Sequence, residues 1–374
     1  MDSYDVIIIG AGMAGASLAA ELGGRVRVAV LEAEDRPGVH ATGRSAALYA
    51  PAYGGADVRA LTRASRAFFD TPPQGFADHP LLSPRDLLYV ATEEQAPRLA
   101  AFLEEIGDSV VPLAVDEALA WMPLLRPGYA AAAAKAREGS AMDIDVHALH
   151  QGYLRLARRQ GVTLLTEAPA AAPQRQGDLW VLQTGGKTVA APMVVNAAGA
   201  WAERVGQAFG AAPLGLAPLR RTALLVDPPP GSGDVNRWPG VFDTDEQFYM
   251  KPDAGKLLLS PADETPSAPC DAQPDELDVA IAVDRVQQAL DLPVRHVSHR
   301  WAGLRTFVPD RQPVVGFDAE VKGLFWCAGQ GGYGIQMAPA LARLAASLVL
   351  GRAVPDDILA EGLVLDNVLP NRLK

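Results

Sequence analysis

One stretch decides the fold of this chain: Asp5-Val6-Ile7-Ile8-Ile9-Gly10-Ala11-Gly12-Met13-Ala14-Gly15-Ala16. It reads as an apolar strand, a GxGxxG turn and the start of a helix, and Arg27-Val28-Ala29-Val30-Leu31-Glu32 follows as a second strand that ends in an acid. The glycines permit a tight turn and a close approach to a pyrophosphate, and an acid about 20 residues downstream meets a ribose hydroxyl. This order predicts a dinucleotide-binding domain at the start of the chain.

Length and composition narrow the class of protein. At 374 residues the chain is expected to form two domains. The 33 basic and 44 acidic residues give a formal net charge of -11, which disfavours nucleic acid or an anionic membrane as a partner. Cys270 and Cys327 have no ligand-spaced partners, so neither a disulfide nor a metal site is predicted. Without a signal peptide or a transmembrane run, we expect a cytoplasmic protein, with peripheral contact to the inner membrane left open.

Signals for the dinucleotide-binding fold recur in three separated segments. The second includes a helix pattern from residue 146 and the apolar run 193–196, and the third includes the run 323–329 and a helix over 337–350. Between them, residues 80–140 read as helical and irregular and residues 212–295 as rich in strands. We therefore expect an α/β fold with a discontinuous nucleotide-binding domain (1–80, 140–211 and 296–374) and a substrate-binding domain (81–139 and 212–295).

A glycine cluster near the C-terminus favours FAD over NAD. In Gly329-Gln330-Gly331-Gly332-Tyr333-Gly334, a strand delivers glycines to the start of a long helix. Backbone N–H groups and the positive end of that helix can face a developing negative charge. A flavin that accepts hydride needs such an arrangement at its pyrimidine edge, whereas an NAD enzyme with one such domain has no need of it.

Five motifs in one order carry a family resemblance: residues 5–17 (DVIIIGAGMAGAS), 40–49 (HATGRSAALY), 195–201 (VNAAGAW), 301–310 (WAGLRTFVPD) and 329–336 (GQGGYGIQ). The chain resembles the D-amino acid oxidase superfamily of FAD-dependent oxidoreductases, and within it the bacterial D-arginine dehydrogenase-like enzymes. The resemblance implies a glutathione-reductase-type, Rossmann-like FAD-binding domain and a substrate domain built on a mixed, largely antiparallel sheet. It also implies non-covalent FAD and hydride transfer from Cα of a D-amino acid to flavin N5, giving an imino acid that hydrolyses to a 2-oxo acid and ammonia.

The expected chemistry needs a clamp for the substrate carboxylate, and a guanidinium matches a carboxylate bidentately. Arg305 and Arg221 stand in suitable contexts, with Arg220 as the rival of Arg221. The resemblance assigns carboxylate binding to Arg221 and Arg305. It further assigns active-site roles to Tyr53 and Tyr249, a backbone carbonyl on the substrate amine to Gly332, and an amide near flavin or substrate to Gln336.

The residues expected to contact the cofactor lie in the same motifs. They are Gly10, Gly12, Met13, Ala14, Gly15, Glu32, Ala33, Thr42, Gly43, Arg44, Ser45, Ala46, Ala47, Ala198, Gly199, Trp201, Gly303, Gly331, Gly332, Tyr333, Gly334, Ile335 and Gln336. Structural roles are expected for His40, His147, His150 and His299, since a general base needs demonstrated geometry. Cys327 suggests a covalent flavin, but its place in an apolar strand favours core packing.

Two positions depart from the arginine-specific relatives, which carry a histidine at Leu48 and a glutamate at Leu87. A basic substrate side chain would lose its counter-charge there, unless Asp86 turned inward. We therefore predict a preference for D-amino acids with apolar side chains.

The alternative functions are an oxidase that uses oxygen, a dehydrogenase of 2-hydroxy acids or secondary amines, and a non-enzymatic electron carrier or redox sensor. The electron acceptor (quinone, electron-transfer protein or oxygen) is not encoded in any motif.

Overall fold

The apolar run before the first glycine turn forms the buried strand β2 (Val6–Ile9) in a computed structural model that describes residues 1–373. Helix α1 (Met13–Leu22) and strand β3 (Val28–Leu31) follow, so that Glu32 stands at the end of β3. Gly10 has φ +100°, and a Cβ atom on Gly15 would lie 1.9 Å from the Gly10 carbonyl oxygen. Larger residues at either position would strain or block this turn.

The six-stranded sheet around β2 has the order β10-β3-β2-β14-β22-β21. Strands β10 (Thr163–Leu165), β14 (Met193–Asn196) and β22 (Leu324–Ala328) run parallel to β2 and β3, and β21 (Val314–Phe317) is antiparallel to β22. Successive residues point to opposite faces, so Ile8 enters one apolar core and Ile7 another. This is the predicted nucleotide-binding architecture.

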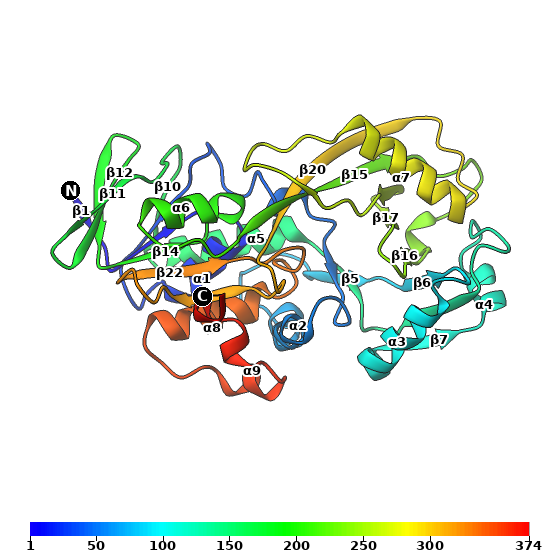
Figure 1. Ribbon diagram of the computed structural model, residues 1–374, viewed down its shortest axis with the longest axis horizontal. Coiled ribbons are helices and arrows are strands. Elements are labelled where there is room, and N and C mark those ends of the chain that lie inside the picture. Colours follow the sequence, from blue (N-terminus) through cyan, green and yellow to red (C-terminus); the bar gives the residue numbers. More distant parts are fainter. Residues whose placement is uncertain (374) are drawn as a thin grey trace.

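Helices cover one face of this sheet and a second sheet covers the other (Figure 1). The core with Ile8 includes residues of α1, α2 (Ala56–Asp70), α5 (Val146–Arg159) and α8 (Ala338–Val349). The core with Ile7 includes residues of α6 (Ala202–Ala208) and of a four-stranded sheet. That sheet has the order β1-β13-β12-β11, with the bounds Asp2–Ser3, Lys187–Ala191, Leu179–Thr184 and Ala171–Gln176.

A nine-stranded sheet builds the second region of the molecule (Figure 1). Its order is β19 (Thr265–Pro266), β15 (Ala217–Val226), β18 (Lys256–Ser260), β17 (Tyr249–Asp253), β16 (Gly240–Asp243), β6 (Leu87–Ala91), β8 (Ala132–Ala136) and β7 (Val110–Leu113), with β20 (Val297–Phe307) paired to β15. The β6–β16 pairing is parallel and the other pairings described are antiparallel. The expected α/β fold with a mixed, largely antiparallel second sheet is confirmed.

One expectation about local structure was wrong, and a second was incomplete. Residues 80–140 contain not only α3 (Ala96–Ile106) and α4 (Val115–Trp121) but also β6, β7 and β8. Alanine is a poor strand former, but β8 (AAAKA) is paired on both sides, and this tertiary pairing overrides propensity. The stretch expected to be rich in strands holds helix α7 (Glu276–Ala289), whose buried Val279, Ala282, Val286 and Ala289 show the helical spacing.

Strand pairing also bears on where the boundary between the two predicted domains lies. Strand β20, placed by the sequence with the nucleotide-binding domain, pairs with β15 along nearly its whole length. A small sheet of β4 (Leu48–Tyr49), β9 (Met142–Ile144) and β5 (Leu82–Pro84) adds a further connection. The domain boundaries stay a prediction, and this pairing favours an end of the second region after Phe307 rather than at residue 295.

Helix α9 (Asp356–Ala360) lies near the C-terminus. Across residues 1–373 no helix has the length and apolarity to cross a membrane.

Candidate active site

One cavity of about 440 Å³ contains both the glycine turn and the expected carboxylate clamp. Its lining includes Gly10, Gly12 and Glu32 from the first motif, and Arg221 and Arg305 from β15 and β20. Residues that are almost 300 positions apart in the sequence therefore share one enclosed space. A dinucleotide bound along the turn would meet a substrate bound at the arginines within the same cavity.

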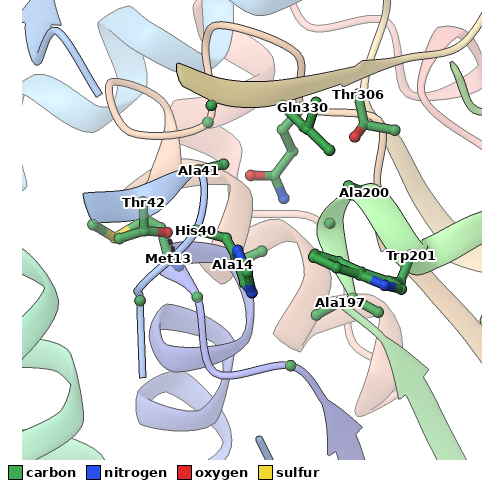
Figure 2. A pocket seen from close by; sticks show the side chains of 18 of the residues that line it. Met13, Ala14, His40, Ala41, Thr42, Ala197, Ala200, Trp201, Thr306 and Gln330 are labelled. Atoms are coloured by element: carbon green, nitrogen blue, oxygen red, sulfur yellow. Dashed lines mark hydrogen bonds between the residues drawn. The ribbon is translucent and has the colours of Figure 1, made fainter. Parts of the chain in front are cut away.

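The acid at the end of β3 is fixed by backbone donors. The Ala11 N–H donates to Glu32 Oε2 at 2.9 Å, and the Glu34 N–H donates to Oε1 at 3.1 Å. Each carboxylate oxygen keeps acceptor capacity for a ribose hydroxyl. In the facing loop the Met13 N–H donates to Thr42 Oγ1 at 2.9 Å, which is the dashed line in Figure 2. These bonds hold the acid, the turn and the loop in one arrangement.

Two rings stand at the same end of the cavity. His40 and Trp201 both line it, with ring centroids 4.7 Å apart (Figure 2). His40 Nε2 lies 2.8 Å from Glu34 Oε1, which fixes the imidazole. Sequence reasoning named Trp201 as a cofactor contact but gave His40 only a structural role. Its position at the start of the HATGR motif was the available signal.

Most of the expected cofactor contacts line the cavity. They are Gly10, Gly12, Met13, Ala14, Glu32, Ala33, Thr42, Arg44, Ser45, Ala46, Ala198, Gly199, Trp201, Gly303, Gly331, Gly332, Gly334 and Ile335. Gly15, Gly43, Ala47, Tyr333 and Gln336 are not part of that lining. Gly15 and Gly43 instead pack against backbone carbonyl oxygens of the same motifs, so their smallness serves the turns themselves.

Arg44, expected to contact the cofactor, also forms several hydrogen bonds within the protein. Although it lines the cavity, its Nε–H donates to Val39 O (3.1 Å) and its Nη1 donates to Ala272 O (2.8 Å) and Ala302 O (2.9 Å). Its Nη2 pairs with Asp271. Because a guanidinium has five N–H donors, these four bonds direct most of its capacity to the protein.

Strand register decides between the two candidate arginines of β15. Arg221 lies opposite Gly303 and Leu219 lies opposite Arg305. Directly paired residues share a face, so Arg221 and Arg305 are diagonal neighbours on one face of the β15–β20 ribbon. Arg220 points to the other face and reaches Asp278 of α7 at 2.8 Å. The geometry therefore places Arg221, and not its rival, beside Arg305 in the cavity.

The two cavity arginines differ in their partners. Arg221 donates through Nε to Asp263 O at 2.8 Å and through Nη2 to Glu264 Oε1 at 3.2 Å. Burial acts to raise the pKa of Glu264, but the hydrogen bonds from Arg311 and the charges of Arg311, Arg221 and Arg305 together hold that pKa below its usual value. Arg305 donates to the Tyr53 hydroxyl at 3.4 Å, and no carboxylate of residues 1–373 forms a salt bridge with it. A half-buried cation without a salt bridge loses part of its hydration uncompensated, so this site suits an anionic ligand.

Smaller and aromatic residues shape the clamp. A Cβ atom on Gly332 would lie 2.9 Å from Arg305 Nη1, so glycine there admits the guanidinium. Burial raises the pKa of the Tyr53 phenol, which keeps its hydroxyl protonated and able to donate. Tyr249 lines the cavity and stacks on Phe242, with ring centroids 5.6 Å apart and planes at 14°. Tyr53 itself lies just outside the described lining and contacts it through Arg305.

The two leucines expected to line the substrate pocket lie behind its wall. Leu87 is buried in an apolar cluster with Ala50, Ala136 and Ala141, and Leu48 packs against the same cluster beside Tyr53. Neither leucine contributes to the lining of the cavity. They share an apolar cluster with Tyr53 and so support that tyrosine through packing.

Sequence reasoning missed two polar side chains in the cavity wall. Thr306 Oγ1 is buried without a hydrogen-bond partner, and Gln330 Nε2 reaches only Cys327 Sγ, at 3.7 Å. Figure 2 shows the Gln330 side chain projecting into the cavity with Thr306 nearby. Buried polar groups normally have partners, so these two fit a polar ligand such as a dinucleotide. Their motifs, WAGLRT and GQGG, were quoted, but only the neighbours were assigned.

Burial raises the pKa of the Cys327 thiol to about 12. Since the thiolate is the nucleophilic form, this cysteine is poorly suited to a covalent bond with a cofactor. Its side chain is 2% exposed in β22, as core packing requires.

A protein-family profile described as "DAO: FAD dependent oxidoreductase" matches residues 5–348. A curated relative, glycine oxidase from Geobacillus kaustophilus, is 28% identical over 364 residues, covering 92% of this chain and 93% of that protein. These matches run through both regions of the molecule and include every element that lines the cavity.

Solved structures match over nearly the whole chain. The crystal structure of glycine oxidase from Geobacillus kaustophilus aligns with a TM-score of 0.82 and 26% identity, covering 98% of this chain and 99% of that one. L-proline dehydrogenase from P. horikoshii aligns with a TM-score of 0.81 and 19% identity, covering 99% and 98%. The second likeness shows a shared fold alone.

Proposed function

We propose a reaction from one premise: this chain belongs to the DAO family of FAD-dependent oxidoreductases. We propose that it oxidises the α-amino group of D-amino acids, with a preference for apolar side chains. The single observation that carries this proposal is Arg305, a cation in the cavity wall that has a tyrosine hydroxyl beside it and no salt-bridge partner in residues 1–373. A substrate carboxylate supplies the missing anion.

The protein groups would bind and orient the substrate. Arg305 and Arg221 hold the carboxylate, with Tyr53 donating a hydroxyl and Tyr249 closing one side. The carbonyl of Gly332, next to Arg305, accepts from the substrate amine. FAD, when bound, would supply the acceptor for the hydride of Cα, and the imino acid left once the amine has lost a proton would hydrolyse to a 2-oxo acid and ammonia. Non-covalent attachment of FAD fits the burial and raised pKa of Cys327.

Two observations support the preference for apolar side chains. The tyrosine of the clamp is backed by the cluster of Leu48 and Leu87, with Phe242 on its border. Asp86, the residue that could have supplied a counter-charge by turning inward, is exposed. A basic side chain placed against this apolar cluster would lose its hydration without gaining an ion pair.

A second candidate, basic D-amino acids, is favoured by one residue. Glu246 follows β16 at an exposed turn, and its charge is among the influences that raise the pKa of Tyr53 and Arg305. A long cationic side chain that reached past the apolar cluster would meet this carboxylate. The side-chain preference therefore depends on the length of the substrate as well as on its polarity.

The test is anaerobic bleaching of the flavin band by a panel of D- and L-amino acids with apolar, acidic and basic side chains. We expect D-leucine, D-methionine or D-phenylalanine to give the highest kcat/KM and L-isomers to give little reduction. Highest values for D-arginine and D-lysine would favour the second candidate. Reduction by 2-hydroxy acids or proline, but by no primary amino acid, would overturn both, and no reduction by any compound would favour an electron carrier. Peroxide release compared with dye reduction separates an oxidase from a dehydrogenase.

A further inference from the structure

Residues 267–275 form a segment, here termed the strap, that crosses the nucleotide end of the cavity. It connects β19 to α7, and its Cys270 and Ala272 belong to the cavity lining. Ala272 is buried and packs with Ala200 and Ala302. The strap thus brings a piece of the second region over the space in which the first motif binds a dinucleotide.

The strap has few bonds of its own. At one end the Ser267 N–H donates to Pro218 O at 3.0 Å, and at the other Asp275 caps α7 by accepting from the Leu277 N–H at 2.9 Å. Between these anchors it forms neither helix nor strand. Segments with few backbone bonds open at low free-energy cost, so what holds the middle of the strap decides how long it stays closed.

Arg44, in the loop 42–44 that also lines the cavity, holds that middle. Its Nη1 donates to Ala272 O in the strap and to Ala302 O in β20, and its Nη2 pairs with Asp271. The Trp301 indole N–H donates to Arg44 O at 3.1 Å, which fixes the arginine backbone. One side chain from the loop after the first motif therefore joins that loop, the strap and the β15–β20 ribbon.

We propose that the strap retains FAD in its cavity and that Arg44 is the positioning residue that latches it. FAD leaves when the Arg44 bonds to Ala272 and Asp271 break and the strap moves off the nucleotide end. This role differs from direct contact with the pyrophosphate, because it acts through the protein bonds of the guanidinium. It depends on the FAD of the family and is independent of the substrate proposed above.

The bonds of Arg44, here termed the latch, include an exposed ion pair with Asp271 and sheltered hydrogen bonds to Ala272 O and Ala302 O. These two kinds of bond should differ in strength. The Asp271 side chain is 64% exposed and that of Arg44 19% exposed, so their ion pair is weak and is screened by salt. The bonds to the two carbonyl oxygens are more sheltered. Losing the whole guanidinium should therefore speed FAD loss more than losing the carboxylate alone.

The experiment measures the rate of FAD release from the holoprotein after dilution, together with the thermal stability of the apoprotein. We expect Asp271→Asn to speed release about two- to fivefold, as for an exposed ion pair, and Arg44→Met about tenfold or more, as for several lost bonds. Arg44→Lys should fall between them, because an ammonium cannot reach all four acceptors. High salt should narrow the difference between Asp271→Asn and the wild type.

Asp291→Asn is the matched control, since Asp291 is an exposed carboxylate paired with Arg126 at 3.2 Å on the same region of the molecule. It should leave FAD release unchanged. The effects of Arg44→Met and Asp271→Asn should also be less than additive, because both remove the same pair. A slower-folding or unstable Arg44 variant would leave the Asp271 variant and the salt series as the test.

Cys270 gives a second readout. Its thiol is exposed and lines the cavity, whereas Cys327 is buried with a raised pKa. A thiol-reactive disulfide reagent should modify Cys270 more slowly in the holoprotein than in the apoprotein, and Arg44→Met should remove part of that protection. The proposal would be overturned if Arg44→Met and Asp271→Asn released FAD at the wild-type rate. It would also be overturned if the Cys270 thiol reacted equally fast with and without FAD.

Discussion

Arg305 is the residue at which function and stability should separate. It is a half-buried cation without a salt-bridge partner in the described chain, so the folded protein gains little from its charge. Replacing the Arg305 guanidinium should lower kcat/KM strongly and leave the stability of the fold unchanged. A charged side chain that is partly buried without a salt bridge is typical of binding sites, where the ligand supplies the missing partner.

We predict that Arg305→Met lowers kcat/KM for the preferred amino acid by about two to four decades, corresponding to about 3 to 5 kcal/mol for a lost buried charge pair. FAD content and the melting temperature should stay equal to those of the wild type or rise. Arg220→Met is the matched control, because that arginine lies on the other face of β15 and pairs with Asp278. Near-wild-type kinetics in Arg305→Met would remove this residue from the mechanism.

At this scale the sequence could name candidates but not choose among neighbours. Arg220 and Arg221 are adjacent and equally basic, and only the pairing of β15 with β20 assigns them to opposite faces. Likewise, Thr306 follows Arg305 directly, but its buried and unpartnered hydroxyl became visible only with the fold in place. The glycine turn needed no such help, because its spacing already specifies the local backbone.

At the scale of elements, helix α5 offers a test of capping. Its N-cap Asp145 accepts from the Ala148 N–H at 2.7 Å, and His79 Nε2 lies 2.9 Å from its other oxygen. Burial acts to raise the pKa of Asp145, but the bonds from Ala148 and His79 outweigh it and hold that pKa below its usual value. The carboxylate therefore stabilises the fold above the unfolded-state pKa, and this contribution is lost as the pH falls through the lower, folded-state pKa.

We predict that Asp145→Ala lowers the stability by about 1 kcal/mol at neutral pH, as for a lost N-cap. The difference from the wild type should shrink when the pH falls below about 4, near the pKa of an unperturbed aspartate. Thermal melting at several pH values measures both. Asp145→Asn keeps an acceptor oxygen and should stay close to the wild type; an Asp145→Ala deficit that grew in acid would contradict the linkage.

Helices and strands with a strong local spacing pattern were predicted from the sequence. Strands that form only because neighbouring strands pair with them were not. The apolar runs of β2, β14 and β22 and the helix patterns of α5 and α8 could be recognised from spacing. Strand β8 has no such pattern and exists because β6 and β7 pair with it. The stretch 212–295 is rich in strands as expected, and only α7 was overlooked there, although its helical spacing was present.

For the whole molecule, a buried ion network connects the two regions. Asp143 of β9 accepts from Lys251 Nζ of β17 at 2.9 Å and pairs with Arg85 at 2.7 Å. Lys251 is buried, and Arg85 also donates to Trp238 O at 3.0 Å. The small β4-β9-β5 sheet is thereby fixed to the nine-stranded sheet near the clamp.

We predict that Asp143→Asn destabilises the protein by about 3 to 5 kcal/mol, because it leaves a buried lysine with an incomplete counter-charge. Lys251→Met should cost clearly less, since Asp143 then keeps Arg85 as its counter-charge. Chemical denaturation of the apoprotein and holoprotein compares the two variants. The reverse order of stabilities would show that the lysine, and not the carboxylate, organises this network.

The sequence by itself determined the dinucleotide fold, the FAD family and the identity of the arginines that could hold an acid, because each is carried by short motifs that can be recognised without knowing which of them meet in space. Only the tertiary structure decided which arginine faces the cavity, that Leu48 and Leu87 stand outside its lining, and that Arg44 bonds to a distant segment of the chain. The physical reason is that strand register and long-range packing join residues hundreds of positions apart, and no local spacing encodes the face on which a side chain then lies.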